Sequence, residues 1–188
     1  MSSFRNIFFD RDGVINDVVI RDSLVSSPRR LDEFRIRNEF VEFHASLCRG
    51  DAMHRPAINT FVVSNQPDVA RGLLSEEDLA AMSDALTQQF QFKEILCCTH
   101  DDSHACSCRK PLPGMIIYLL DKYGISAADS LLIGDSHKDI LAGKAANVTT
   151  VLLRTSYNRD RIPSGVEPDF TVSNLAELFS LGLLVKQK

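Results

Sequence analysis

Two acidic residues near the start of the chain stand directly after a short apolar run. Residues 6–9 have the composition of a buried strand, and Asp10 and Asp12 follow before Gly13 breaks the pattern. Alternate residues of an extended segment point to the same side, so the two carboxylates can share one cation. An aspartate can also act as a nucleophile and form an aspartyl phosphate. A polar turn has the same composition, so these residues alone leave both interpretations open.

The second candidate group consists of three thiols and one imidazole: Cys98, His100, Cys106 and Cys108. They form two close pairs of soft or borderline ligands, and the five residues between the pairs suffice to turn the chain back. The pattern predicts a closed tetrahedral Zn²⁺ site, with buried free thiols or a redox pair as the alternatives. Cys97 is expected on the opposite face of its strand as a core residue, and His104 is not expected to bind the metal.

Two polar residues end another apolar run, and two cations follow the thiol-rich loop. Ser64 and Asn65 close residues 58–65, where a hydroxyl and an amide can hydrogen-bond a phosphate oxygen. Both residue types are also common in turns. Arg109 and Lys110 follow the last cysteine directly, so a rigid metal site there would fix where the two cations point.

A further acidic pair lies at a later strand end. Asp135 ends residues 130–135, and Asp139 lies about one helical turn beyond it on the same face. Asp135 therefore stands in the same relation to its strand as Asp10 does to the first one.

The elements that must position these groups alternate between strand and helix. Strands are predicted at residues 6–9, 58–65, 92–98, 130–135, 149–155 and 169–172, and helices at 40–50, 75–90, 113–124, 136–147 and 173–181. The alternation predicts a three-layer, Rossmann-like α/β fold in which helices cover both faces of a parallel sheet. Ligands of such sheets bind at the carboxyl ends of the strands, so the candidate residues are expected on one rim.

One long connection carries no clear periodic pattern. Residues 17–35 are predicted to form a polar loop, in which Arg29 and Arg30 either contact an anion or are solvated. His44, in the following helix, is expected to be a structural or surface residue rather than a ligand. The loop and the helix account for the whole connection to the second strand, so no separate cap domain is expected and the site should be open.

Size and composition favour a single globular domain over residues 1–188. Apolar residues make up 44% of the chain, and it contains no apolar stretch long enough to span a membrane. No signal-peptide pattern precedes the first strand, so a cytoplasmic location is expected. A net charge of −4 gives no general attraction to nucleic acid. A small-molecule substrate and a monomeric state are therefore expected.

Four motifs together resemble the haloacid dehalogenase superfamily of phosphatases. They are DRDGVIN at residues 10–16, VVSNQ at 62–66, Lys110, and IGDSHKD at 133–139. The thiol-rich run that continues into RKPLPGM is similar to the group containing D-glycero-D-manno-heptose bisphosphate phosphatases and histidinol-phosphate phosphatases. The resemblance implies a capless haloacid dehalogenase fold with a zinc-binding loop.

The same resemblance implies roles for the acidic residues. Asp10 would be the nucleophile and Asp12 the general acid/base. Mg²⁺ would be held by the Asp10 side chain, the Asp12 backbone carbonyl and Asp135. Asp139 would support these ligands without binding the ion itself. The four thiol and imidazole ligands would hold a structural Zn²⁺.

The phosphate-binding residues follow from the resemblance as well. Ser64, Asn65 and Lys110 would bind the transferring phosphoryl group. Independently of the resemblance, an open site needs charges at its rim for specificity, and Arg109, held by the metal-binding loop, could bind a second phosphate through two hydrogen bonds. Pro67 and Asp68 replace a small Ser-Gly pair beside the substrate entrance. Val14 and Thr99 also depart from the usual pattern, at positions where threonine and proline are frequent, and none of these changes removes a catalytic group.

The expected reaction is Mg²⁺-dependent removal of the C7 phosphate from D-glycero-D-manno-heptose 1,7-bisphosphate through an aspartyl phosphate. Histidinol phosphate, another small sugar phosphate and a terminal phosphate on a nucleic acid are the alternative substrates. A phosphosugar-binding module without activity would be expected to have lost Asp10 or Asp12, and both are present.

Overall fold

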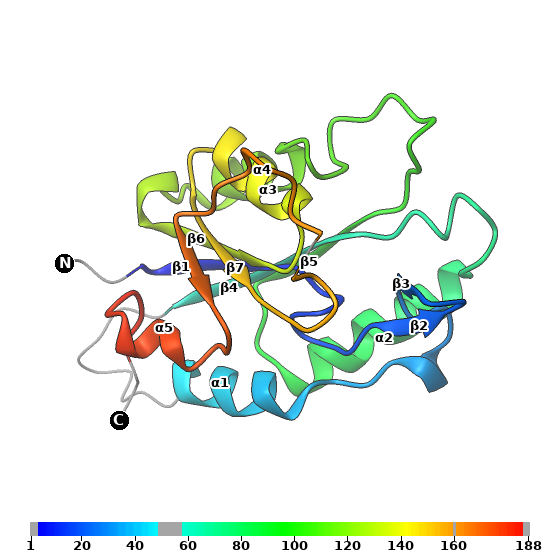
Figure 1. Ribbon diagram of the computed structural model, residues 1–188, viewed down its shortest axis with the longest axis horizontal. Helices are drawn as coiled ribbons and strands as arrows, with labels where there is room; N and C mark the ends of the chain where they lie inside the picture. Colours follow the sequence, from blue (N-terminus) through cyan, green and yellow to red (C-terminus); the bar gives the residue numbers. More distant parts are fainter. Residues whose placement is uncertain (1–3, 49–57, 160, 186–188) are drawn as a thin grey trace.

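The central element of the fold is a six-stranded parallel sheet (Figure 1). The computed structural model describes residues 4–48, 58–159 and 161–185. In the order in which they pair, the strands are β5 (Glu94–Cys98), β4 (Asn59–Asn65), β1 (Asn6–Phe9), β6 (Ser130–Gly134), β7 (Thr149–Leu153) and β8 (Phe170–Val172). All neighbouring pairs are parallel. The predicted Rossmann-like arrangement is therefore confirmed.

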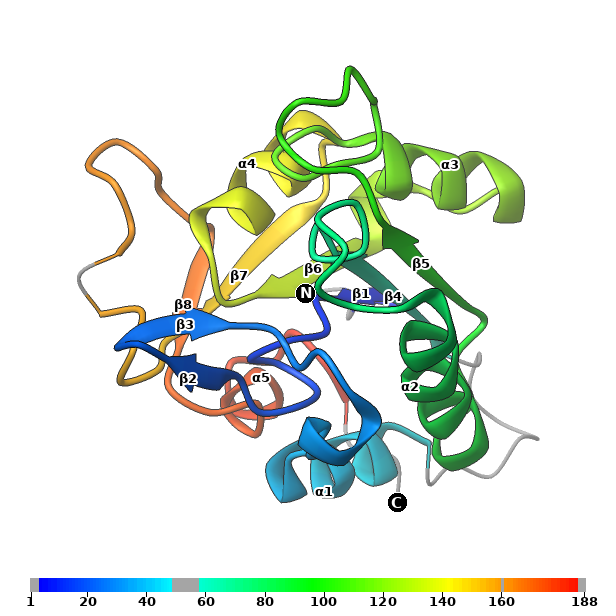
Figure 2. The same ribbon diagram turned by 90° about the vertical axis from the view of Figure 1, so that its right-hand side faces the viewer.

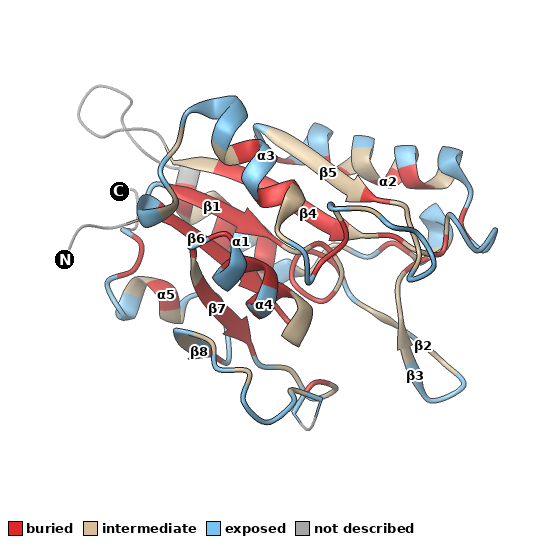
Figure 3. Cartoon of the chain, turned by 90° about the horizontal axis from the view of Figure 1, so that it is seen from above, coloured by how far each residue is buried: buried red, intermediate tan, exposed pale blue. Residues whose placement is uncertain are grey.

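Helices cover both faces of this sheet. One face packs against α1 (Asn38–Cys48), α2 (Glu76–Gln89) and α5 (Glu177–Ser180), and the other packs against α3 (Gly114–Tyr123) and α4 (His137–Ala145) (Figure 1). Side chains of β1 alternate between the two cores, since Ile7 and Phe9 join the first and Phe8 joins the second. Figure 3 shows β1 and β6 as buried strands at the centre of the sheet.

Parallel pairing brings the functional segments to one edge. Phe9, the last residue of β1, pairs with Val62 on one side and Ile133 on the other, and Asn65 pairs with Cys98. The residues that follow these strands therefore leave the sheet together. No helix in the described part of the chain is long and apolar enough to cross a membrane.

The prediction of a polar loop over residues 17–35 is wrong. The segment contains an antiparallel hairpin of β2 (Val19–Arg21) and β3 (Leu24–Ser26), followed by the 3₁₀ helix η1 (Leu31–Glu33). Asp22 and Ser23 form the tight turn, both with positive φ, at 49° and 63°. Such a turn normally contains glycine, and the strands are only three residues long, so neither usual hairpin signal was present.

Several predicted boundaries also shift. The last helix begins at Glu177, four residues later than predicted, because residues 173–176 form the turn that leads into it. The 3₁₀ helix η2 (Ala127–Asp129) was not predicted. The predicted end of the first helix near Gly50 lies outside the described residues.

His44 packs inside an aromatic cluster on the α1 side of the sheet. Its ring centroid lies 4.9 Å from that of Phe90, 5.4 Å from Phe92 and 5.8 Å from Phe40. The side chain is structural, as expected, and the residue is only 5% exposed. Burial lowers the pKa of His44 to about 4.

This burial predicts a pH dependence of stability. Between pH 4 and 6.5 the unfolded chain binds a proton at His44 that the folded chain does not, so the free energy of unfolding falls as the pH falls through this window. The contribution of one such proton is about 1.4 kcal/mol per pH unit. Urea unfolding at pH 5 and pH 7 should show a smaller pH dependence for His44→Gln than for the wild type. Equal pH dependences in the two proteins would contradict the assignment.

Candidate active site

A pocket of about 390 Å³ opens at the carboxyl ends of the strands. Six of the residues predicted from the sequence line it: Asp10, Asp12, Asn65, Arg109, Lys110 and Asp135. Val25 and Ser26 of the β2–β3 hairpin line it as well. Figure 2, which faces this end of the sheet, shows the hairpin and the connections after β4, β5 and β7 arranged around the strand ends. The site is thus open to solvent but bounded on one side by the hairpin.

Lys110 is the buried cation at the base of the pocket. Its Nζ donates to Asp139 Oδ1 at 2.5 Å and to the Val63 carbonyl at 2.7 Å, and lies 2.8 Å from Asp10 Oδ1. Asn65 fixes its backbone, because Asn65 Oδ1 accepts from the Lys110 N–H at 3.0 Å and Asn65 Nδ2 donates to the Lys110 carbonyl at 2.8 Å. Burial alone would lower the pKa of Lys110, but the carboxylates of Asp10 and Asp139 outweigh it and raise that pKa.

Three carboxylates gather beside this lysine, two of them in contact with it. Asp10, Asp135 and Asp139 each offer an oxygen, and the three oxygens lie within 4.8 Å of one another. Burial, and then the charge on Asp139, raises the pKa of Asp10 to about 7. Burial and the charge on Asp10 raise the pKa of Asp135. One lysine does not compensate three carboxylates, so the electrostatics favour a bound cation, and carboxylate oxygens are the ligands that Mg²⁺ prefers.

Asp139 differs from the other two because both of its oxygens are already engaged. Oδ1 accepts from Lys110, and Oδ2 accepts from the Ser136 N–H at 3.0 Å and the Ser136 hydroxyl at 2.6 Å. These contacts form the capping box of α4. A Cβ at Gly134 would lie 2.2 Å from the Asp139 Cβ. Residue 134 must therefore be glycine for the start of α4 to pack this close to the end of β6. Asp139 therefore holds Lys110 and the start of α4.

Asp12 is held by three donors that were not assigned a role from the sequence. Arg11 donates to both carboxylate oxygens, at 3.1 and 3.2 Å. Asn16 Nδ2 donates to Oδ1 at 2.9 Å, and Gln66 Nε2 donates to Oδ2 at 2.7 Å. Burial tends to raise the pKa of Asp12, but Arg11 and the other donors lower it overall. Asp12 is consequently a carboxylate at neutral pH in the free protein.

Ser64 lies beneath the pocket rather than in its lining. It is 1% exposed, and its Oγ accepts from Gln66 Nε2 at 2.8 Å, so Gln66 joins Ser64 to Asp12. Arg11 and Gln66 are both fully buried. In the sequence, only their positions next to Asp12 and Asn65 could have indicated that Arg11 and Gln66 belong to the site. Residue type alone does not distinguish a buried polar side chain from a solvated one.

The four predicted zinc ligands converge in the loop after β5. Their donor atoms form a cluster: Cys98 Sγ lies 3.0 Å from Cys108 Sγ, 3.9 Å from Cys106 Sγ and 3.5 Å from His100 Nδ1, which lies 3.3 Å from Cys108 Sγ. A tetrahedral Zn²⁺ with Zn–S bonds of about 2.3 Å holds its sulfur ligands about 3.8 Å apart. The donor set therefore fits Zn²⁺, and the Cys98–Cys106 separation agrees with this value, whereas Cys98 and Cys108 lie closer together than they would around the ion.

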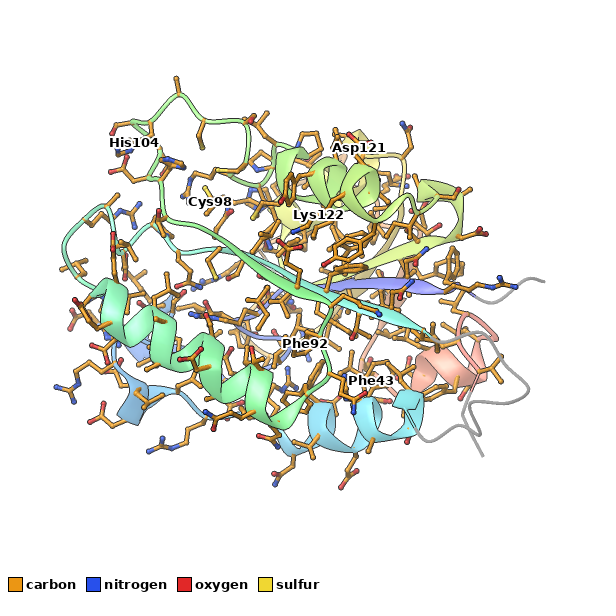
Figure 4. All side chains as sticks on the ribbon, turned by 180° about the vertical axis from the view of Figure 1, so that it is seen from behind. Phe43, Phe92, Cys98, His104, Asp121 and Lys122 are labelled. Atoms are coloured by element: carbon orange, nitrogen blue, oxygen red, sulfur yellow. The ribbon has the colours of Figure 1, made fainter. Side chains whose placement is uncertain are left out.

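His104 lies outside this cluster, as predicted. Its Nδ1 bonds Asp101 Oδ1 at 2.7 Å, and its side chain is 48% exposed. Figure 4 shows His104 in the outer part of the loop and Cys98 close to the sheet.

Charged side chains link the loops around the pocket entrance. Arg29 donates to Asp68 at 2.7 Å, and Arg71 lies 3.3 Å from Asp68 and 3.7 Å from Asp102. Arg109 Nε donates to Asp102 Oδ1 at 2.9 Å. Of the two arginines considered as anion contacts, Arg29 is thus bound to a carboxylate of the chain. The other, Arg30, is bound in the same way, through Asp32.

Comparisons with known proteins agree with this geometry. The HAD-hydrolase-like family model matches residues 107–178. D-glycero-beta-D-manno-heptose-1,7-bisphosphate 7-phosphatase of Vibrio cholerae is 32% identical over 168 residues, which cover 79% of this chain and 81% of the relative. D-glycero-alpha-D-manno-heptose-1,7-bisphosphate 7-phosphatase of Campylobacter jejuni is 31% identical over 152 residues, 78% of this chain and 80% of the relative.

A solved structure gives the same result at the level of the fold. D,D-heptose 1,7-bisphosphate phosphatase from B. bronchiseptica, complexed with magnesium and phosphate, superimposes with a TM-score of 0.77 at 28% identity, covering 95% of this chain and 98% of that one. Motifs, fold and relatives agree. The chain belongs to the D-glycero-D-manno-heptose-1,7-bisphosphate 7-phosphatase family of HAD-like hydrolases.

Proposed function

We propose that this protein is a Mg²⁺-dependent phosphatase that removes the C7 phosphate of D-glycero-D-manno-heptose 1,7-bisphosphate. The observation that carries the proposal is the buried Lys110, which holds the carboxylate of Asp10 at the base of an open pocket beside Asp135. The family relatives with this activity support the choice of substrate. Relatives are named for both anomers, and our proposal covers either one.

Magnesium would be held by the side chains of Asp10 and Asp135 and by the backbone carbonyl of Asp12. The residues fit the ion, because the Asp10 and Asp135 oxygens lie close together with raised pKa values that a cation would offset. Bound there, Mg²⁺ would neutralise charge on the phosphoryl oxygens. The remaining chemistry belongs to the side chains of the chain itself.

In the first step, a carboxylate oxygen of Asp10 attacks phosphorus. The bond between phosphorus and the C7 oxygen breaks, and Asp12 gives a proton to the leaving oxygen. Asp12 is a carboxylate in the free protein, and the approach of the phosphate dianion raises its pKa, so it takes up this proton from solvent before the transfer. The products are the free C7 hydroxyl and an aspartyl phosphate on Asp10.

In the second step, Asp12 takes a proton from a water molecule, which attacks the phosphorus of the aspartyl phosphate. The bond between phosphorus and the Asp10 oxygen breaks, so inorganic phosphate leaves and the Asp10 carboxylate is restored. Lys110 binds the phosphoryl group during both steps, and Asn65 holds the Lys110 backbone in place. Ser64, which lies beneath the pocket, supports Asp12 through Gln66. Asp139 positions Lys110.

The loop after β5 is proposed to bind a structural Zn²⁺ through Cys98, His100, Cys106 and Cys108. Such a site uses thiolates, which persist in a reducing compartment, and this supports a cytoplasmic location. The groups named for catalysis come from one chain, so a monomer contains the whole site.

Arg109 is proposed to select the substrate. It lines the pocket and is anchored to the zinc loop through Asp102 and the His100 carbonyl. A guanidinium held in this way can bind the phosphate that is not cleaved, and so orient the other phosphate against Asp10. Histidinol phosphate carries an amine at its other end, which Arg109 would repel.

The first prediction concerns the nucleophile. Asp10→Asn should lower kcat by on the order of 10³-fold or more, because an amide cannot attack phosphorus and brings no negative charge to the metal site. Asp121→Asn, an exposed change on α3, is the matched control and should retain activity (Figure 4). Steady-state hydrolysis of the bisphosphate is the measurement. Near-normal turnover by folded Asp10→Asn protein would place the nucleophile elsewhere.

The second prediction concerns zinc. Cys106→Ser should remove Zn²⁺, disorder the loop and release Arg109, whereas Asn65 still holds the Lys110 backbone. The expected result is a lower melting temperature and a KM raised more strongly than kcat is lowered. His104→Ala, in the same loop but outside the cluster, should retain zinc and activity. Wild-type protein that is active without zinc by elemental analysis would refute a structural zinc site.

The third prediction concerns specificity. Arg109→Ala should lower kcat/KM for the bisphosphate by roughly 10- to 100-fold, the value of a charge-assisted hydrogen bond pair, and change hydrolysis of a monophosphate much less. Arg30→Ala, whose side chain is 67% exposed, is the control and should leave the preference for bisphosphate intact. A wild-type kcat/KM for histidinol phosphate that equals or exceeds the bisphosphate value would replace the proposed substrate.

A further inference from the structure

A tyrosine that belongs to none of the four motifs contacts the proposed metal site. Tyr157 lies in the connection that follows β7, and its hydroxyl donates to Asp135 Oδ2 at 2.8 Å. It also lines the pocket. In Figure 2 the described parts of this connection lie at the left, and the loop after β5 lies at the top.

The position of this tyrosine is fixed by its neighbour. Asn158 is 3% exposed, and its Nδ2 donates to the backbone carbonyls of Asp135 and Leu153, each at 2.8 Å. Asn158 Oδ1 accepts from the Thr155 N–H at 2.8 Å. Residues 155–158 are thereby attached to the ends of both β6 and β7, so the tyrosine is held against Asp135 by buried hydrogen bonds.

The first catalytic loop leaves space for this contact. Gly13 has a φ of +88°, and a Cβ built on it would lie 2.2 Å from Asp135 Oδ2 and 2.3 Å from the Tyr157 hydroxyl oxygen. Any side chain at residue 13 would therefore collide with both partners of the hydrogen bond. Three segments that are distant in the sequence thus meet at this contact.

We propose that Tyr157 is a positioning residue for Asp135: its hydroxyl fixes the rotation of the carboxylate and so strengthens binding of Mg²⁺. The inference depends on the magnesium site of the proposed function. A carboxylate with no donor on it can rotate about its last bond, and fixing it in advance removes that entropic cost from metal binding. Within the described part of the chain, Tyr157 is the residue whose hydrogen bond reaches the Asp135 side chain.

The test is Tyr157→Phe, which removes only the hydroxyl. Binding of Mn²⁺ to the substrate-free protein, followed by electron paramagnetic resonance, should weaken by about 10- to 100-fold, the usual effect of losing a partner of a metal ligand. The Mg²⁺ concentration needed for half-maximal activity should rise by a similar factor. At saturating Mg²⁺, kcat and the substrate KM should stay within about twofold of the wild type, because the hydroxyl acts through Asp135.

Tyr123→Phe is the matched control. Its hydroxyl lies 3.1 Å from a carboxylate oxygen of Glu94, far from the pocket, so its loss should leave Mn²⁺ binding unchanged. Equal Mn²⁺ affinity in Tyr157→Phe and the wild type would overturn the inference and leave the proposed function standing. A raised substrate KM at saturating Mg²⁺ would also overturn it, by making Tyr157 a substrate contact. Absence of Mn²⁺ binding by the wild type would overturn both the inference and the proposed metal site.

Discussion

The structure of the site depends on one buried charge. Lys110 is 2% exposed and has three acceptors, one from each of β4, the loop after β1 and the start of α4. A buried ammonium is tolerated only with such complete pairing, since an unpaired one costs several kcal/mol. Its acceptors therefore have to remain where they are. The lysine fixes the relative positions of three segments, and the same arrangement leaves Asp10 and Asp135 with surplus negative charge facing the pocket.

Much of this arrangement could be predicted because the sheet is parallel. The apolar runs before Asp10, Ser64 and Asp135 could be recognised as strands from the sequence. Parallel pairing brings the carboxyl ends of such strands to one edge of the sheet. The convergence of Cys98, His100, Cys106 and Cys108 could be predicted because the five residues between the two close pairs suffice to turn the chain back. The fold class and the family are both confirmed.

What the sequence did not reveal depends on burial and on contacts across the fold. Arg11 and Gln66 were not singled out, since only the structure places them inside the protein around Asp12. Tyr157 gave no signal because its partner is 22 residues away in the sequence. The β2–β3 hairpin was missed because its turn, Asp22–Ser23, has no glycine and relies on contacts such as that of Arg21 with Ser26.

The β2–β3 hairpin also bears on how this fold could acquire new substrates. Its two strands pair with each other and, within the described residues, with no strand of the six-stranded sheet, and the side chains of Ile20 and Leu24 are exposed. Lengthening a surface turn costs little free energy, because loop entropy grows only slowly with length. Insertions at Asp22–Ser23 could therefore raise or reshape one wall of the pocket while the reacting groups stay in place. In evolutionary terms, this wall of the pocket can change without a change in the reacting groups.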